Sequence, residues 1–187
     1  LILITGPTGS GKTSSLYAGL ASVIRPDINV VTLEDPVEYQ MAGVNQVQIN
    51  QRVGLSFASG LRTILRQDPD IVMVGEIRDP ETAAIAMQAS MTGHLVLSTL
   101  HTNDAPSAVS RLIDMGVEPF LITSSLTLVV GQRLARVPCE KCSEPVEASP
   151  RTLELLGLEP EEVEHAELRM GSGCGFCAQT GYKGRLG

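Results

Sequence analysis

One octapeptide near the start of the chain, GPTGSGKT at residues 6–13, constrains the fold more than any other feature of the sequence. It fits the pattern G-x-x-x-x-G-K-[ST], the Walker A pattern, which binds phosphate groups. The apolar residues LILI at 1–4 are typical of a buried parallel strand, and the apolar stripe within 14–24 favours a helix. Because strand, loop and helix follow in the order that phosphate binding requires, we expect a nucleotide-binding loop rather than a simple glycine-rich turn.

Each part of this loop has an expected task. Its glycines let the backbone take conformations that a side chain would forbid, so that backbone N–H groups converge on an anion at the start of the helix. Lys12 is expected to reach the β- and γ-phosphates of ATP, and Thr13 is expected to ligate Mg²⁺. The candidate nucleotide-binding residues are Gly6, Pro7, Thr8, Gly9, Ser10, Gly11, Lys12 and Thr13.

The remaining sequence alternates between strand and helix patterns. Buried strands are expected at 28–33, 71–74 and 95–100. Helices are expected at 56–67 with Ser56 as N-cap, from Asp79 onward, at 109–115 and at 120–136. This alternation predicts an α/β fold with a mainly parallel sheet.

Composition changes after Pro138. All four cysteines lie beyond this point, together with a cluster of acidic residues. We therefore expect a core domain at 1–137 and a small subdomain at 138–187. A strand at the first residue without an initiator methionine, and an end that looks cut, also lead us to expect a piece of a longer protein. The acidic cluster comprises Glu154, Glu159, Glu161, Glu162 and Glu164.

Charge and composition count against a nucleic-acid partner. The formal net charge is −7, aromatic residues make up 3% of the chain and tryptophan is absent, so both a basic stripe and a base-stacking surface are poorly supplied. The longest apolar stretch, 117–130, is too short and too interrupted by polar residues to span a bilayer.

Polar residues follow the expected strands at the sheet edge where ligands bind in such folds. Glu34, Glu38 and Glu76 are candidates to orient or deprotonate the attacking water, and sequence alone does not rank them. Glu76 is also expected to contact the water shell of Mg²⁺, although Gly75 stands where an aspartate is usual. His101 is placed to sense the γ-phosphate. The alternative for Glu76 is a solvated charge at a strand end.

Four further residues have open roles. His94 lies at the opposite end of its strand from His101, where a structural hydrogen bond and a functional role are both reasonable. Arg62, Arg66 and Arg78 could contact a nucleotide across a subunit boundary, or could be ordinary surface charges.

The cysteines form two C-x-x-C pairs, Cys139 with Cys142 and Cys174 with Cys177. Two such pairs suit a tetrahedral Zn²⁺ site, and four thiolates leave no open position, so the site is expected to be structural. Disulfides and unrelated thiols are the alternatives. A core that uses ATP implies a reducing cytosol, which counts against disulfides.

Four blocks in order resemble the type II secretion and type IV pilus assembly ATPases. GPTGSGKT is similar to their Walker A, TLEDPVEY at 32–39 to their Asp box, and TGHLVLSTLHTNDA at 92–105 to their His box. RQDPDIVMVGEIRD at 66–79 is similar to their atypical Walker B, including the glycine at position 75. The resemblance covers residues 1–135, and four motifs in this order are highly specific.

The resemblance implies a RecA-like P-loop core that works in a homohexameric ring. It also implies an N-terminal domain, outside this sequence, that supplies arginines to a neighbouring subunit's site. The four cysteines and the GYKGR that follows them resemble the assembly branch rather than pilus-retraction members.

The expected function is a hexameric ATPase motor that powers assembly of a secretion pseudopilus or a type IV pilus. Such a motor implies ATP, Mg²⁺ and Zn²⁺ as cofactors, and an inner-membrane platform protein with its cytoplasmic adaptor as partners. It implies a cytoplasmic location, peripheral to the bacterial inner membrane. The alternatives are a DNA-translocating or DNA-uptake motor with the same core, and a nucleotide-binding scaffold without catalysis.

Overall fold

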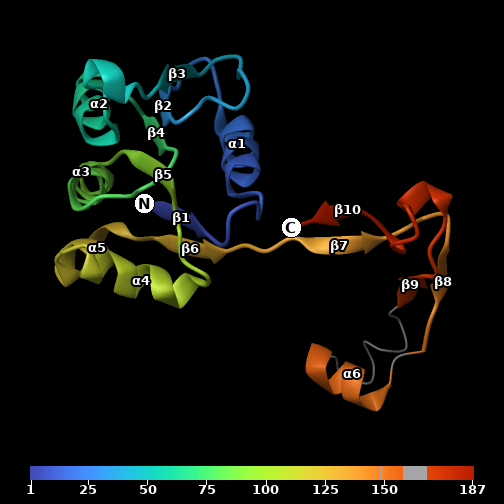
Figure 1. Ribbon diagram of the computed structural model, residues 1–187. Helices are drawn as coiled ribbons and strands as arrows, with labels where there is room; N and C mark the ends of the chain where they lie inside the picture. The colour runs from blue at the N-terminus through green and yellow to red at the C-terminus, as the bar shows by residue number, and fades with distance from the viewer. Residues whose placement is uncertain (148, 158–167) are drawn as a thin grey trace. The chain divides into compact units, whose positions relative to one another are not determined.

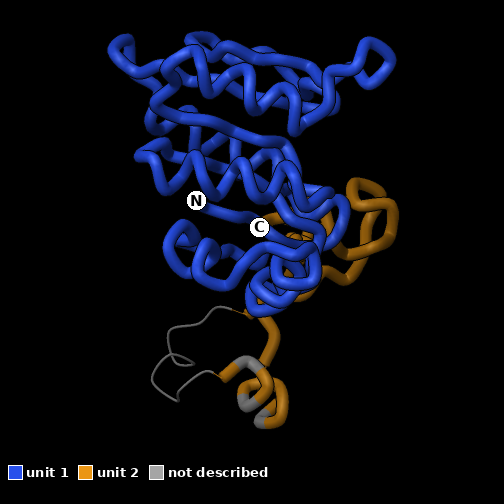
Figure 2. The backbone as a smooth tube through the Cα atoms, turned by 90° about the vertical axis from the view of Figure 1, so that its left-hand side faces the viewer, with its two compact units in different colours: residues 1–133 blue, residues 134–187 orange. Residues whose placement is uncertain are grey.

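The computed structural model describes residues 1–147, 149–157 and 168–187. Within these ranges the chain forms two compact units, residues 1–133 and residues 134–187, which are coloured separately in Figure 2. Among the described residues, no helix combines the length and the apolar character needed to span a membrane.

Unit 1 is built on a six-stranded sheet in which all neighbouring strands are parallel. The strand order is β3-β2-β4-β5-β1-β6 (Figure 1). The predicted α/β fold with a parallel sheet is confirmed. The strands are β1 (Ile2–Thr5), β2 (Val30–Glu34), β3 (Asn45–Gln48), β4 (Ile71–Val74), β5 (Leu95–Leu100) and β6 (Leu128–Gly131).

Helices cover both faces of this sheet. Helix α1 (Lys12–Val23) packs on one face, where Leu16, Tyr17 and Leu20 are fully buried against the strands. Four helices pack on the other face (Figure 1), around a larger apolar core. They are α2 (Phe57–Ile64), α3 (Pro80–Met91), α4 (Ala105–Asp114) and α5 (Pro119–Ser125).

Local capping signals fix two of these helix starts as predicted. The Ser56 side chain accepts from the backbone N–H of Ser59, and the Ser59 hydroxyl accepts from that of Ser56, which forms a capping box at α2. Asp79 caps α3 by accepting from the backbone N–H of Thr82. Asp104 caps α4 in the same way, so this helix begins four residues before the predicted start at residue 109.

The prediction of a helix over 120–136 is wrong. Helix α5 ends at Ser125, strand β6 follows, and strand β7 occupies Ala135–Pro138. The two valines of β6 favour an extended backbone, and the open edge of β1 offers it a parallel partner. Apolar content alone cannot distinguish a short buried strand from a helix. Here the pairing of β6 with β1 determines the secondary structure, and this pairing is not visible in the local sequence. The polar edge strand β3 was missed for a similar reason.

The described residues of unit 2 form two small antiparallel strand pairs and the helix α6. β7 pairs with β10 (Tyr182–Leu186), and β8 (Ser143–Pro145) pairs with β9 (Arg169–Gly171). Helix α6 covers Pro150–Leu156. Of the acidic cluster noted in the sequence, Glu159, Glu161, Glu162 and Glu164 lie outside the described residues.

Candidate functional site

The glycine-rich loop joins the end of β1 to the start of α1. Gly6, Gly9 and Gly11 have φ values of 144°, 78° and 84°, a region that side chains disfavour. A Cβ on Gly6 would collide with the carbonyl oxygen of Gln132 and lie 2.8 Å from Ser10 Oγ. The loop therefore depends on glycine both for its conformation and for the room inside it.

The Lys12 ammonium lies over this loop. Its Nζ donates to the carbonyl oxygens of Gly6 and Pro7, at 2.9 and 3.1 Å. Burial lowers the pKa of Lys12, while the negative charge of Glu76 acts in the opposite direction. Ser10 Oγ is buried and has no hydrogen-bond partner among the described residues. A buried cation and an unpartnered hydroxyl beside a cradle of backbone N–H groups fit a phosphate group well.

Gln132, which follows strand β6, holds the loop in place. Its side-chain amide donates to the Ser10 carbonyl at 2.8 Å and accepts from Ser15 Oγ at 2.8 Å, and its backbone N–H donates to Thr5 at 2.8 Å. No sequence motif predicts this role, because Gln132 reaches the loop only when β6 pairs with β1.

Glu34 is the last residue of strand β2 and Glu38 lies in the loop after it, and the two side chains have different surroundings. Glu34 is 2% exposed, and its carboxylate accepts from Tyr17 Oη, from Thr32 Oγ1 at 2.6 Å and from Gln46 Nε2 at 3.0 Å. Glu38 is exposed, and no hydrogen bond or ion pair engages its carboxylate within the described part of the chain. Glu34 is therefore occupied by neighbouring side chains, whereas the Glu38 carboxylate is available.

Glu76 lies at the carboxyl end of β4 and is held from two sides. One carboxylate oxygen forms an ion pair with Arg78, and the other lies 3.1 Å from His101 Nε2 at the end of β5. The hydrogen bond to Glu76 raises the pKa of Arg78. The structure thus brings Glu76 and His101 together at the sheet edge that also carries Lys12, whose electrostatic coupling to Glu76 acts on its pKa.

The other polar candidates lie in ordinary structural contacts. His94 Nδ1 lies 2.9 Å from the Ala89 carbonyl and 3.1 Å from Thr92 Oγ1, which closes the turn between α3 and β5. Arg62 forms an ion pair with Glu81 of α3, and Arg66 is exposed in the 3₁₀ turn after α2.

Packing explains why glycine occupies position 75. Its N–H donates to the Leu33 carbonyl at 2.8 Å, and a Cβ on Gly75 would lie only 3.2 Å from that same oxygen. The Leu33 oxygen belongs to the centre of the sheet and cannot retreat easily. An aspartate at this position would therefore push β4 away from β2.

We expect Gly75→Ala to destabilise the protein by about 1–3 kcal/mol through overpacking. Gly19→Ala is the matched control, because Gly19 is exposed within α1 and nothing lies near its missing Cβ. It should stabilise the helix by about 0.5–1 kcal/mol. Urea unfolding followed by circular dichroism measures both changes, and shifts in the same direction would contradict the packing argument.

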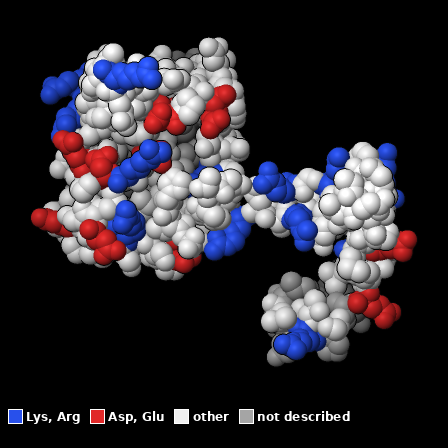
Figure 3. Space-filling view, viewed as in Figure 1, with Lys and Arg blue, Asp and Glu red and all other residues white. Residues whose placement is uncertain are grey.

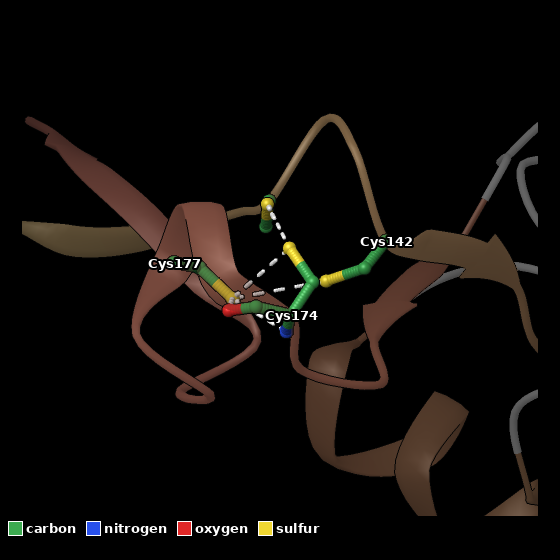
Figure 4. A group of neighbouring side chains, drawn as sticks. Cys142, Cys174 and Cys177 are labelled. Atoms are coloured by element: carbon green, nitrogen blue, oxygen red, sulfur yellow. Dashed lines mark hydrogen bonds between the residues drawn. The ribbon is translucent and has the colours of Figure 1, made fainter.

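The four cysteines of unit 2 form one cluster. Their Sγ atoms all lie within 4.8 Å of one another, with Cys139–Cys174, Cys142–Cys177 and Cys174–Cys177 separations of 3.9, 3.8 and 3.8 Å. Figure 4 shows the sulfur atoms of the labelled cysteines gathered in one place. A tetrahedral ion with Zn–S bonds of about 2.3 Å holds its ligands about 3.8 Å apart, so the cluster fits Zn²⁺.

Backbone N–H groups near Cys177 favour its ionised form. Burial raises the pKa of the Cys177 thiol, but backbone N–H groups of Cys174 and Gly181, with the neighbouring thiols, outweigh it and lower the pKa to about 6. These N–H groups lie 3.2 and 3.3 Å from Cys177 Sγ. They favour the thiolate form that ligates zinc.

A parallel α/β sheet with a phosphate-binding loop and a converging acidic edge defines unit 1 as a RecA-like P-loop nucleotide-binding core. The chain belongs to the family "Type II/IV secretion system protein", whose sequence model matches residues 1–187. The resemblance noted in the sequence is thereby confirmed at the level of the family.

Individual relatives support this assignment. The chain is 56% identical over 187 residues to "Type II secretion system protein E" of Pseudomonas aeruginosa, covering 100% of this chain and 37% of that protein. It is 56% identical over 185 residues to "Type IV pilus assembly ATPase PilB" of Thermus thermophilus, covering 99% of this chain and 21% of that protein. The chain thus spans well under half of either relative.

A solved structure shares the fold. The pilus retraction motor PilT with bound ADP superposes with a TM-score of 0.66 at 38% identity, covering 73% of this chain and 42% of that chain. This likeness supports the RecA-like fold of unit 1.

Proposed function

We propose that this chain is the nucleotide-binding part of a hexameric ATPase motor that powers assembly of a secretion pseudopilus or a type IV pilus. The observation that carries the proposal is the match along the whole chain, at 56% identity, to proteins named for these two systems. The cysteine cluster on a second unit supports the assembly branch, and we propose that this unit is a zinc-stabilised domain.

Phosphate binding would use the residues gathered at the loop. The backbone N–H groups of residues 9–13 and the Lys12 ammonium would hold the β- and γ-phosphates of ATP, while the orphaned Ser10 hydroxyl offers one more donor. Thr13 would hold Mg²⁺, which when bound neutralises charge on the phosphates. Glu76, whose carboxylate contacts Arg78 and His101, would orient the water around that ion.

Glu38 is the best candidate to orient and deprotonate the attacking water. Its carboxylate has no partner among the described residues, whereas Glu34 accepts three hydrogen bonds and Glu76 has both oxygens engaged. A base must be free to accept a proton, which favours Glu38 over the other two. Glu34 would then act through the loop that follows it.

We expect Glu38→Gln to lower kcat for ATP hydrolysis by roughly 10²–10⁴-fold and to leave ATP affinity within a few-fold, because it removes the base but keeps the shape. Glu118→Gln, at an exposed residue before α5, is the control and should keep full turnover. Steady-state hydrolysis and binding of a fluorescent ATP analogue measure the two quantities. Unchanged turnover in Glu38→Gln would reject this residue as the base.

The charge pattern supports a protein-assembly motor over a DNA motor. On the face of unit 1 shown in Figure 3, lysines and arginines are interspersed with acidic residues, and the described residues there form no continuous basic stripe. We propose that the motor works at the cytoplasmic face of the inner membrane, as a peripheral homohexamer, with a membrane platform protein and its cytoplasmic adaptor as partners.

A cellular experiment tests the motor role. The full-length gene carrying Glu38→Gln would replace the native allele in its own bacterium, beside a Glu118→Gln strain. We expect loss of either surface pili or type II secretion, with normal protein levels. A strain with intact pili and secretion but lost conjugative DNA transfer would instead favour the DNA motor.

A further inference from the structure

Tyr17 is a buried side chain with an unusual set of partners. It lies on α1, five residues after Lys12, and is 1% exposed. Its ring belongs to the apolar cluster between α1 and the sheet, but its hydroxyl reaches past the end of β2. Unlike its apolar neighbours in α1, it therefore joins the core to the polar edge of the sheet.

The hydroxyl of Tyr17 both donates and accepts hydrogen bonds. It donates to the Glu34 carboxylate and accepts from the backbone N–H of Glu38 at 3.2 Å. Burial and the bond to Glu34 raise the pKa of Tyr17 to about 12, so the hydroxyl keeps its proton at physiological pH. A tyrosine hydroxyl can play both roles at once, whereas phenylalanine can play neither.

The loop that carries Glu38 is also held by two glutamines of β3. Gln48 accepts from the backbone N–H of Val37 at 3.5 Å. Gln46 of β3 donates to the carbonyl of Tyr39 at 3.1 Å and accepts from the N–H of Met41 at 2.8 Å. The Tyr39 ring lies 4.3 Å from that of Tyr17 between centroids. The backbone N–H of Glu38 itself donates to the Tyr17 hydroxyl, and a hydrogen bond from the backbone of Tyr39 acts on the same hydroxyl.

The same rigid helix carries the phosphate-binding lysine and this tyrosine. With a rise of about 1.5 Å per residue, Lys12 and Tyr17 lie about 7.5 Å apart along the axis of α1. The backbone hydrogen bonds of α1 leave its residues little conformational freedom, so the distance between Lys12 and Tyr17 is nearly fixed. A shift of the Glu38 backbone away from α1 would lengthen or break its hydrogen bond to Tyr17.

We infer that Tyr17 is a positioning residue that fixes the backbone of Glu38 relative to the phosphate-binding loop. This inference rests on the proposed ATPase function and on Glu38 as its base. Glu34 supports this role, because its buried carboxylate orients the Tyr17 hydroxyl so that a lone pair faces the Glu38 N–H. The role belongs to the hydroxyl and not to the ring.

Tyr17→Phe in the full-length protein tests the inference, because it keeps the ring and removes the hydroxyl with its hydrogen bonds. We expect kcat for ATP hydrolysis to fall about 10- to 100-fold, the cost of a small misplacement of a reacting group, while the KM for ATP changes less than about threefold. In a Glu38→Gln background the same change should add little, since residues that act as a unit are not additive.

Two control variants separate positioning from mere packing. Thr32→Val removes another hydrogen bond to the same Glu34 carboxylate without reaching the loop, and Tyr39→Phe removes an exposed hydroxyl beside it. Both should keep kcat within about threefold. Hydrogen exchange at the Glu38 amide gives a readout independent of activity, and it should accelerate in Tyr17→Phe only.

The outcomes are distinct. If the wild-type protein is active and Tyr17→Phe has the same kcat, the inference is overturned and the proposed function stands. The same conclusion follows if Thr32→Val lowers kcat as much as Tyr17→Phe does. An inactive wild-type protein would overturn the proposed function and the inference with it. If Tyr17→Phe does not fold, the stabilising change Gly19→Ala in the same helix restores a background in which the kcat comparison is made.

Discussion

Lys12→Ala should reduce ATP hydrolysis by roughly 10²–10³-fold or more, and it should also weaken ATP binding. Its ammonium is buried over the loop, where it donates to two carbonyl oxygens that would otherwise repel an incoming phosphate. An alanine removes the positive charge and leaves those oxygens facing the anion. Both ATP affinity and turnover should therefore fall, which separates this variant from Glu38→Gln.

The matched control is Lys141→Ala, which removes an exposed lysine from unit 2. Calorimetric titration with ATP and steady-state hydrolysis should show wild-type behaviour for this variant. If Lys12→Ala bound ATP and turned it over at the wild-type rate, the loop after β1 would not be the phosphate site.

Removing zinc should unfold unit 2 and leave unit 1 folded. Structural Zn²⁺ in small peptides contributes an apparent folding free energy of about 10–16 kcal/mol at pH 7, more than two short antiparallel strand pairs can replace. The same result is expected for Cys177→Ser, whose thiol is buried and accepts two backbone N–H groups. Limited proteolysis should then cut after residue 133 and release an intact core.

Metal analysis and thiol titration complete this experiment. The native protein should contain one zinc per chain and show four reactive thiols only after chelation, since the sequence holds four cysteines. Ser143→Ala, which lies next to the cluster and keeps all four of its thiols, is the control. A chelated protein that resists protease after residue 133 as well as the native protein does would contradict a structural metal.

Local sequence signals predicted most of the fold. The phosphate-binding loop is continuous in sequence, and the caps Ser56 and Asp79 act over three residues, so each is visible without the fold. Strands β4 and β5 were placed to the residue, because each is a short apolar run between clear breaks. Where pairing between distant segments decides, as for β6 beside β1, the sequence pattern misled.

For the polar site too, the sequence predicts which residues take part but not the contacts between distant segments. The sequence indicated Glu34, Glu38 and Glu76 as a set, but their ranking depends on partners from other elements. Tyr17 reads as an apolar helix position, and nothing in the sequence pattern predicts that its hydroxyl bridges two glutamates. Gln132 is hidden in the same way, since its contact with Ser10 spans more than a hundred residues.

Mg²⁺-dependent ATP hydrolysis by the full-length protein, measured with and without double-stranded DNA, tests the central claim most directly. The claim is that this core drives protein assembly by hydrolysing ATP at the loop after β1. We expect turnover that requires Mg²⁺, is lost in Lys12→Ala and is unchanged by DNA. Strong stimulation by DNA, or no hydrolysis by a folded, ATP-bound oligomer, would contradict it.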